Sequence, residues 1–114
     1  MTYTYNENED WDKARFFFES KFGKGIDLEG MLFLIGVREM GLGLQSFSKQ
    51  EKMELIHIAL CSLLEPKGFY ELEKYDSDGW PHYKKGPAFR VLSKKDQQEL
   101  IKNAIINYTR EVSL

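Results

Sequence analysis

The sequence is poor in several features that would assign it to a class of protein. It has one cysteine, Cys61, so no disulfide can form within the chain. It has three prolines, which leaves long stretches free to form helices. Its apolar runs fall short of the ~18 residues that a membrane span needs, and residues 1–10 lack the basic and apolar regions of a secretion signal. These absences predict a cytoplasmic protein without a membrane segment, in which Cys61 is reduced and buried.

An excess of charge of one sign is also missing. The chain has 16 Lys and Arg residues and 18 Asp and Glu residues, for a net charge of −2. Non-specific nucleic-acid binding depends on cations placed against phosphates, so this balance argues against a nucleic-acid partner. The densest basic segments are short, and we interpret them as solvated surface residues. They are Lys84-Lys85 with Arg90, and Lys94-Lys95.

The motifs that mark common catalytic and cofactor sites are absent as well. The sequence contains neither G-x-G-x-x-G, nor a P-loop, nor G-x-S-x-G. It also shows no pairing of a nucleophile with a base. We therefore expect no catalytic residue and no cofactor, and we favour a protein that is not an enzyme.

What the 114 residues do contain is an apolar block from Leu28 to Leu64, followed by a charged, aromatic segment from Phe69 to Lys84. Apolar residues recur at helical spacing along most of the chain and alternate in this segment. We predict a single α+β domain that is mainly α, with a three-helix N-terminal bundle, a β-hairpin and a C-terminal helix. Within residues 1–114, the predicted helices cover 9–22, 28–40, 48–65 and 93–111, the strands cover 69–75 and 80–84, and 1–7 form a tail.

Polar residues indicate where three of these helices begin. Asp27 is suited to cap the second helix, and Ser93 is suited to cap the fourth. Ser48 and Glu51 have the spacing of a capping box at the start of the third helix. The predicted core face of that third helix consists of Met53, Ile56, Leu60, Leu63 and Leu64.

The helix predicted over 28–40 is apolar on nearly all sides. Such a helix either occupies the centre of a bundle or is buried at an interface. Its interior glycines, Gly30 and Gly36, each cost about 1 kcal/mol relative to alanine and therefore indicate close approach of another element. Because this helix and an aromatic content of 14% exceed what one small bundle easily covers, we predict a homodimer.

Two histidines raise the question of a metal site. Glu54 and His57 have the E-x-x-H spacing that di-iron bundles use twice, but the chain has one such pair. Nothing in the spacing of His82 and Glu39 requires them to complete a three-ligand set. We therefore predict no metal ligand, and we interpret His57 as a core histidine bonded to a carbonyl or a carboxylate.

The segment Asp76 to Gly79 is interpreted as the tight turn of the hairpin. It matches part of a calcium-loop pattern, but Lys74 and Lys85 stand where the first and last carboxylates of such a loop belong. Pro81 has no amide proton to donate, so the returning strand is expected at an edge.

The returning strand is the best candidate for a functional surface. Trp80 and His82 share one face of a strand that starts at residue 80, and Tyr83 takes the other face. If Tyr83 packs on the helices, Trp80 and His82 face outward and form an interaction surface together with Lys84. The alternative is that Trp80 folds over the helices as a lid on the core.

These observations favour a non-enzymatic intracellular protein-interaction module that acts as a homo-oligomer. The first alternative is a winged-helix-like DNA-binding protein, because helices precede a hairpin. In that class the recognition helix exposes a basic, polar face, whereas the helix over 48–65 is mostly apolar after Lys49, Gln50 and Lys52. The second alternative is a metal-dependent enzyme.

Three segments also carry a resemblance: Asp27 to Gly41, Phe47 to Glu51 and Asp78 to His82. They are similar to parts of a family of small uncharacterised proteins from Bacteroidetes-type bacteria, and the resemblance covers about residues 27–84. It implies a bacterial source. Because that family has no assigned activity, the resemblance implies no functional residue.

Overall fold

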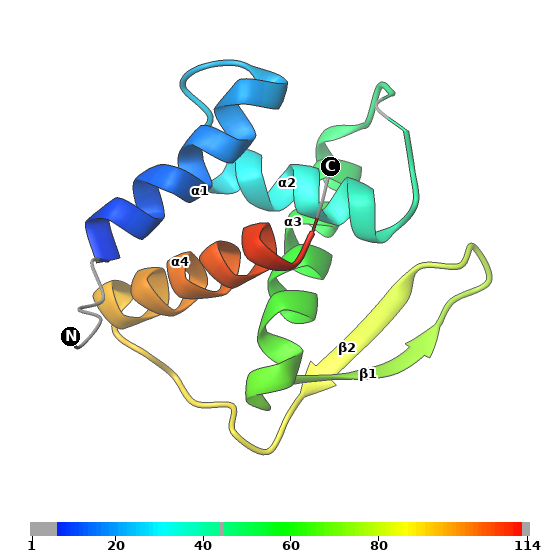
Figure 1. The fold of residues 1–114 in the computed structure, drawn as a ribbon. Coiled ribbons are helices and arrows are strands. Elements are labelled where there is room, and N and C mark those ends of the chain that lie inside the picture. The colour runs from blue at the N-terminus through cyan, green and yellow to red at the C-terminus, as the bar shows by residue number, and fades with distance from the viewer. Residues whose placement is uncertain (1–6, 44, 113–114) are drawn as a thin grey trace.

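The computed structural model describes residues 7–43 and 45–112. They form helices and one antiparallel hairpin in the predicted order, so the predicted α+β class is confirmed (Figure 1). The largest shift of an element end is at the first helix, which begins at Glu7 rather than at residue 9; the rest of the predicted tail lies outside the described residues. The helices are α1 (Glu7–Phe22), α2 (Leu28–Glu39), α3 (Lys49–Leu64), the short 3-10 turn η1 (Glu65–Lys67) and α4 (Lys94–Glu111), and the strands are β1 (Tyr70–Tyr75) and β2 (Pro81–Lys85).

Each of the three predicted caps begins its helix. Asp27 accepts a backbone amide of the first turn of α2 at 2.7 Å. Ser48 Oγ accepts the Glu51 amide at 3.0 Å, and the Glu51 carboxylate accepts the Ser48 amide at 2.9 Å, which completes the capping box. The bond from the Ser48 amide, followed by that of its side chain, holds the pKa of Glu51 below its usual value. Ser93 Oγ accepts the Asp96 amide at 3.1 Å at the start of α4.

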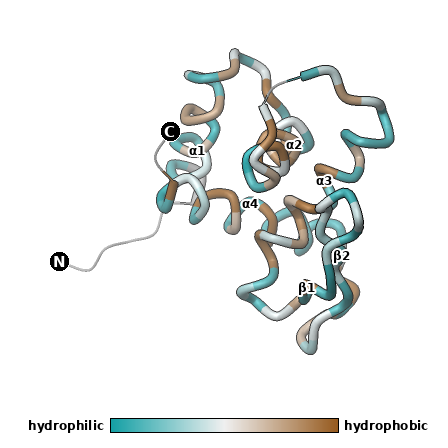
Figure 2. Tube along the Cα trace, turned by 90° about the vertical axis from the view of Figure 1, so that its right-hand side faces the viewer, coloured by the Kyte–Doolittle hydropathy of each residue, from teal (hydrophilic) through white to brown (hydrophobic). Residues whose placement is uncertain are grey.

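The hydrophobic core lies where the four helices meet. α2 packs along α3, while α4 packs against both α1 and α3. Figure 2 shows hydrophobic stretches on α2 and α3 in the interior and hydrophilic ones over much of the hairpin. The fourth helix is therefore part of the same core as the N-terminal three. The buried residues at its centre are Phe18 of α1, Met31, Leu32 and Ile35 of α2, Ala59 of α3, and Ile101 and Ile105 of α4.

α2 is the central helix of this core, which is one of the two roles predicted for it. Gly36 lies so close to α3 that a Cβ at this position would overlap the backbone carbonyl of Leu55. Gly30, in contrast, adjoins the side chain of its own N-cap, Asp27. The close approach of a second element, predicted from both glycines, therefore holds for Gly36 and is wrong for Gly30.

The hairpin packs on α3 through both strands and projects from the side of the helical core (Figure 1). Its register places Leu72 opposite Tyr83 and Lys74 opposite His82, so Glu73 is an extra residue between two paired positions. Such a bulge bends and twists the ribbon. A second buried cluster of Leu64, Phe69 and Ala104 joins the base of the hairpin to α3 and α4.

Cys61 is fully buried in α3, as predicted. Burial raises the pKa of its thiol to about 12. At neutral pH the thiol is therefore protonated and a poor nucleophile. None of the described helices is both long enough and apolar enough to cross a bilayer.

Candidate functional site

An open groove of about 460 Å³, here called the hairpin groove, lies between the hairpin and the first half of α3. It includes two of the three residues predicted as an interaction surface, Trp80 and His82. Lys84 is not among its lining residues: its Nζ lies 3.8 Å from Oε2 of Glu71, its neighbour across the hairpin. The groove is lined by Gln50, Met53, Glu54, His57 and Ile58 of α3 and by Asp76, Trp80, Pro81, His82 and Tyr83 of the hairpin.

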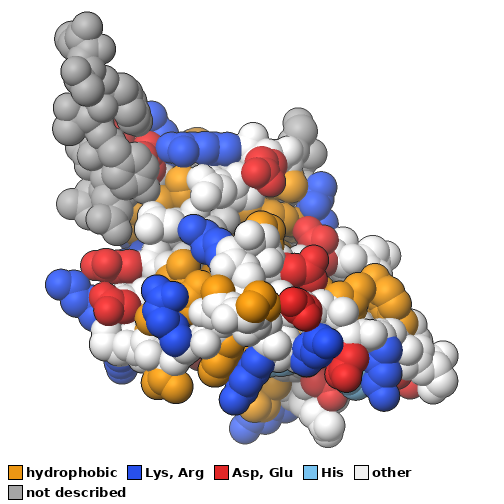
Figure 3. Space-filling view, turned by 90° about the horizontal axis from the view of Figure 1, so that it is seen from below, with side chains coloured by type: hydrophobic (Ala, Val, Ile, Leu, Met, Phe, Trp, Pro, Cys, Tyr) orange, Lys and Arg blue, Asp and Glu red, His pale blue; other side chains and the backbone are white. Residues whose placement is uncertain are grey.

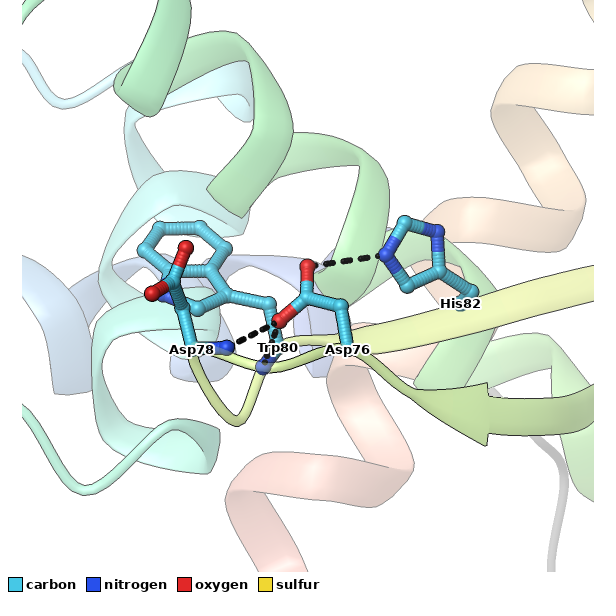
Figure 4. A network of polar contacts seen from close by, with 4 residues as sticks. All are labelled: Asp76, Asp78, Trp80 and His82. Carbon is cyan, nitrogen blue, oxygen red and sulfur yellow. Dashed lines mark hydrogen bonds and ion pairs between the residues drawn. The ribbon is translucent and has the colours of Figure 1, made fainter.

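The Asp76 carboxylate organises the hairpin side of the groove (Figure 4). Its Oδ1 accepts the backbone amides of Asp78 at 2.9 Å and of Trp80 at 3.0 Å, which closes the turn. Its Oδ2 lies 2.9 Å from Nε2 of His82, which donates the hydrogen bond. This bond is the first cause of a lowered pKa for Asp76, followed by the bond from the Trp80 amide. One carboxylate therefore closes the turn and orients His82.

Trp80 lies in the turn and not in the returning strand, which begins one residue later at Pro81. The alternation of a strand therefore does not set its direction, and the predicted start of the strand at residue 80 is corrected. Figure 4 shows the Trp80 indole and the His82 imidazole on opposite sides of the Asp76 carboxylate. The indole is half-buried and belongs to neither buried cluster of the core. It lines the hairpin groove.

Tyr83 packs on the helices. This was the condition under which His82 was predicted to face outward. Tyr83 is half-buried on β2, which packs on α3, and burial is the first cause of its raised pKa. His82 remains exposed. The burial of β2 alternates at these two positions, as predicted, and both residues border the groove.

His57 is exposed on the groove side of α3, so its prediction as a core histidine is wrong. Leu55 and Ile58 occupy the core side of the helix instead. The His57 ring has Nε2 at 3.5 Å from Sγ of Cys61, one turn along the helix, and lies edge-on to Tyr70 at 6.3 Å. Its partner is therefore a buried thiol on the same helix, and not the carbonyl or carboxylate expected for it.

Met53 was predicted on the core face of α3, and this prediction is also wrong. Its side chain is 62% exposed, whereas Leu55, Ile58 and Ala59 are buried. The rest of the predicted face does pack in the core, since Leu64 is buried and Ile56, Leu60 and Leu63 are half-buried against it. The buried face also extends to Leu55, where Gly36 allows close contact with α2. Met53 is a groove residue that the sequence analysis missed.

Glu39 lies away from the hairpin groove and borders a different cavity. Among residues 7–43 and 45–112, no three His, Cys, Asp or Glu side chains are grouped so that they could hold a metal ion. The groove lining in this part of the chain includes the carboxylates of Glu54 and Asp76 but no Lys, Arg, Ser, Thr or Cys. Its chemistry is therefore that of an acidic, aromatic surface with two imidazoles.

Comparisons of the chain with protein-family models, with curated proteins and with solved structures gave no match. The resemblance of residues 27–84 to a family of small bacterial proteins therefore stays a prediction. The function has to be argued from the geometry of the site itself.

Proposed function

We propose that this chain is a non-enzymatic, intracellular protein-interaction module that acts as a homodimer through the hairpin groove. The proposal depends on one observation, which is that large apolar side chains are exposed around this groove. Met53, which lines the groove, is 62% exposed, and Tyr75, which pairs with the lining residue Pro81, is 64% exposed. Together with the half-buried Trp80 they supply the residue types, Met and aromatic, that are enriched at protein interfaces.

The chemistry of the groove supports an interaction role over an enzymatic one. The Asp76–His82 pair has the form of an oriented base, but the described lining contains no hydroxyl of Ser or Thr and no thiol for it to activate. Cys61 is buried with a raised pKa. A structural role alone explains the pair, because the same Asp76 carboxylate closes the hairpin turn.

The charges favour a protein partner over DNA. Glu54 and Asp76 line the groove, and Lys49 and Lys52 at the start of α3 are not among its lining residues. Two carboxylates repel a phosphate backbone. On the face seen in Figure 3, the described Lys and Arg side chains are interspersed with Asp and Glu side chains and form no continuous basic area.

The surface on which we expect a dimer to form is the hairpin groove and not α2. Most of the apolar surface of α2, from which the dimer was predicted, is covered within the same chain, where Met31, Leu32, Ile35 and Val37 are buried. The proposed interface therefore lies at the hairpin groove, where exposed apolar groups of one copy would meet those of another. Burial of such groups is the main favourable term in most protein association.

The test is the mass of the protein in solution, measured by light scattering at tens of micromolar. We expect a dimer for the unchanged chain and a monomer for Met53→Glu and for Trp80→Ala, both with folded spectra. Phe16→Ala is the matched control, because Phe16 is an exposed aromatic residue on α1, outside the groove, and should leave the dimer intact. A monomer for the unchanged chain contradicts the proposal.

Trp80→Ala also separates the two roles that the sequence left open for this residue. A contact residue should lose assembly with little change in the free energy of unfolding. A loss of ~3 kcal/mol or more, which is the scale for truncating a buried aromatic residue, would show instead that Trp80 is a core residue.

A further inference from the structure

A cavity of about 210 Å³, here called the helix pocket, is lined by residues of the C-terminal halves of α1 and α2, by Leu42 and by the last turn of α4. It shares no lining residue with the hairpin groove. Apart from Arg38 and Tyr108, every residue that lines it is apolar. It is open to solvent, and Phe22 in its wall is 41% exposed. The apolar wall includes Phe18, Phe22, Ile35 and Val37.

Two polar groups from different helices converge at this pocket. Nη1 of Arg38 donates to the Tyr108 hydroxyl at 3.1 Å, and Cζ of Arg38 lies 5.7 Å from the centre of the Tyr108 ring. Burial is the first cause of a raised pKa for Tyr108, so its phenol is neutral at physiological pH. These contacts hold the guanidinium beside the pocket and fix its orientation.

The guanidinium of Arg38 retains capacity to bind an anion. The Glu39 carboxylate lies 3.7 Å from Nη1, but Glu39 borders a neighbouring cavity and not the helix pocket. Both of these contacts of Arg38, with Tyr108 and with Glu39, are made through Nη1, which leaves the edge formed by Nε and Nη2 to receive an anion. A guanidinium binds a carboxylate best through two parallel N–H···O bonds, and this edge of Arg38 can supply them.

We propose that the helix pocket binds a small amphiphilic carboxylate, with its apolar body against the phenylalanine side chains and its carboxylate on Arg38. The size fits this class, because an apolar cavity of about 150 Å³ already binds benzene. A cavity of about 210 Å³ therefore has room for one ring or a short alkyl chain. The apolar wall supplies affinity for the body, and the single cation selects a carboxylate over a neutral head group.

The experiment uses octanoate as the probe and 1-octanol as its neutral counterpart, with binding to the unchanged chain measured by calorimetry. We expect octanoate to bind more tightly than octanol. Arg38→Gln should weaken octanoate binding about tenfold or more and leave octanol binding unchanged, because it removes a charged hydrogen-bond partner and no apolar contact. Glu39→Gln should strengthen octanoate binding a few-fold, since it removes the competing carboxylate.

Arg90→Gln is the matched control. Arg90 stacks on Phe69 at 5.4 Å, much as Arg38 stacks on Tyr108, but it does not line the helix pocket. It should leave octanoate binding unchanged. Leu42→Trp places a larger side chain in the wall of the pocket and should weaken both probes together.

Three results would overturn the proposal: no octanoate binding at millimolar concentration, equal binding of octanoate and octanol, or octanoate binding that survives Arg38→Gln. None of these results bears on the proposed dimer, because the two sites share no residue. Amide shifts in nuclear magnetic resonance spectra locate the probe, and octanoate should perturb Phe22 and Tyr108 rather than the hairpin.

Discussion

The helical core and the hairpin are stabilised by different kinds of contact. In the core, side chains from four helices far apart in the sequence bury one another. In the hairpin, β1 is exposed from Glu71 to Tyr75, and the turn is closed by one carboxylate that bonds groups within six residues of it. The two sides of the hairpin groove therefore have different origins. The hairpin side is shaped by hydrogen bonds within the turn, whereas the α3 side depends on the packing of the whole helical core.

The largest effect is expected in the core, where Ile105→Ala should cost about 2–5 kcal/mol of unfolding free energy. Ile105 is fully buried on α4, so the change tests whether this helix belongs to the core. Urea unfolding monitored by circular dichroism gives the measurement. Gln98→Ala, at an exposed position of α4, should stay within about 0.5 kcal/mol. A loss for Ile105→Ala as small as that of the control would show that α4 is not needed to complete the core.

Gly36→Ala should cost about 1–3 kcal/mol, because the added methyl group overlaps the backbone of Leu55 and forces α2 and α3 apart. This loss outweighs the gain in helix propensity of about 1 kcal/mol. Gly43→Ala is the control, since a Cβ at Gly43 meets no atom within 4 Å. Thermal and urea unfolding of the two variants provide the comparison, and a neutral Gly36→Ala would contradict the close approach of the two helices.

Ser48→Ala should cost about 1 kcal/mol, because it removes the cap at the groove end of α3. The exposed Ser46, two residues earlier, provides the control, and Ser46→Ala should have almost no effect. The measurement is the urea midpoint of unfolding, compared between Ser48→Ala and Ser46→Ala. An unchanged midpoint for Ser48→Ala would mean that α3 begins elsewhere.

The smallest effect on stability is expected from protonation of Asp76 in the hairpin, which should loosen the turn and leave the core folded. The pKa of Asp76 is lower in the folded chain than in the unfolded chain. Its bonds therefore stabilise the turn fully above the unfolded pKa of about 3.9, and this stability is lost as pH falls through the lower, folded value. Amide shifts of Asp78 and Trp80, followed by nuclear magnetic resonance, should titrate below the pKa of a free aspartate.

Asp76→Asn should abolish this titration and speed amide exchange at Trp80, while the urea midpoint of the core stays nearly unchanged. Asp78→Asn is the matched control, because the backbone amide of Asp78, and not its carboxylate, joins the network drawn in Figure 4. A large fall in the urea midpoint of Asp76→Asn would mean that the turn and the core unfold as one unit, and the comparison of the two regions would fail.

Features that depend on neighbours in the sequence could be predicted. The caps at Asp27, Ser48 and Ser93 and the turn from Asp76 to Gly79 each involve atoms only a few residues apart, and the structure contains all four. The burial of Cys61 was also predictable, because its neighbours in α3 are apolar.

The sequence by itself thus determined the order of the helices and strands and the caps at which three helices begin, because capping and turn formation are short-range. Only the tertiary structure decided which side of each helix is covered. α3 is apolar on several sides, so its periodicity does not say whether α2 or the hairpin packs on a given side, and Met53 and His57 were placed wrongly for that reason. The pairing of Asp76 with His82 and the meeting of Arg38 with Tyr108 likewise need the folded chain, because they depend on side chains brought together by the pairing of strands and the packing of helices.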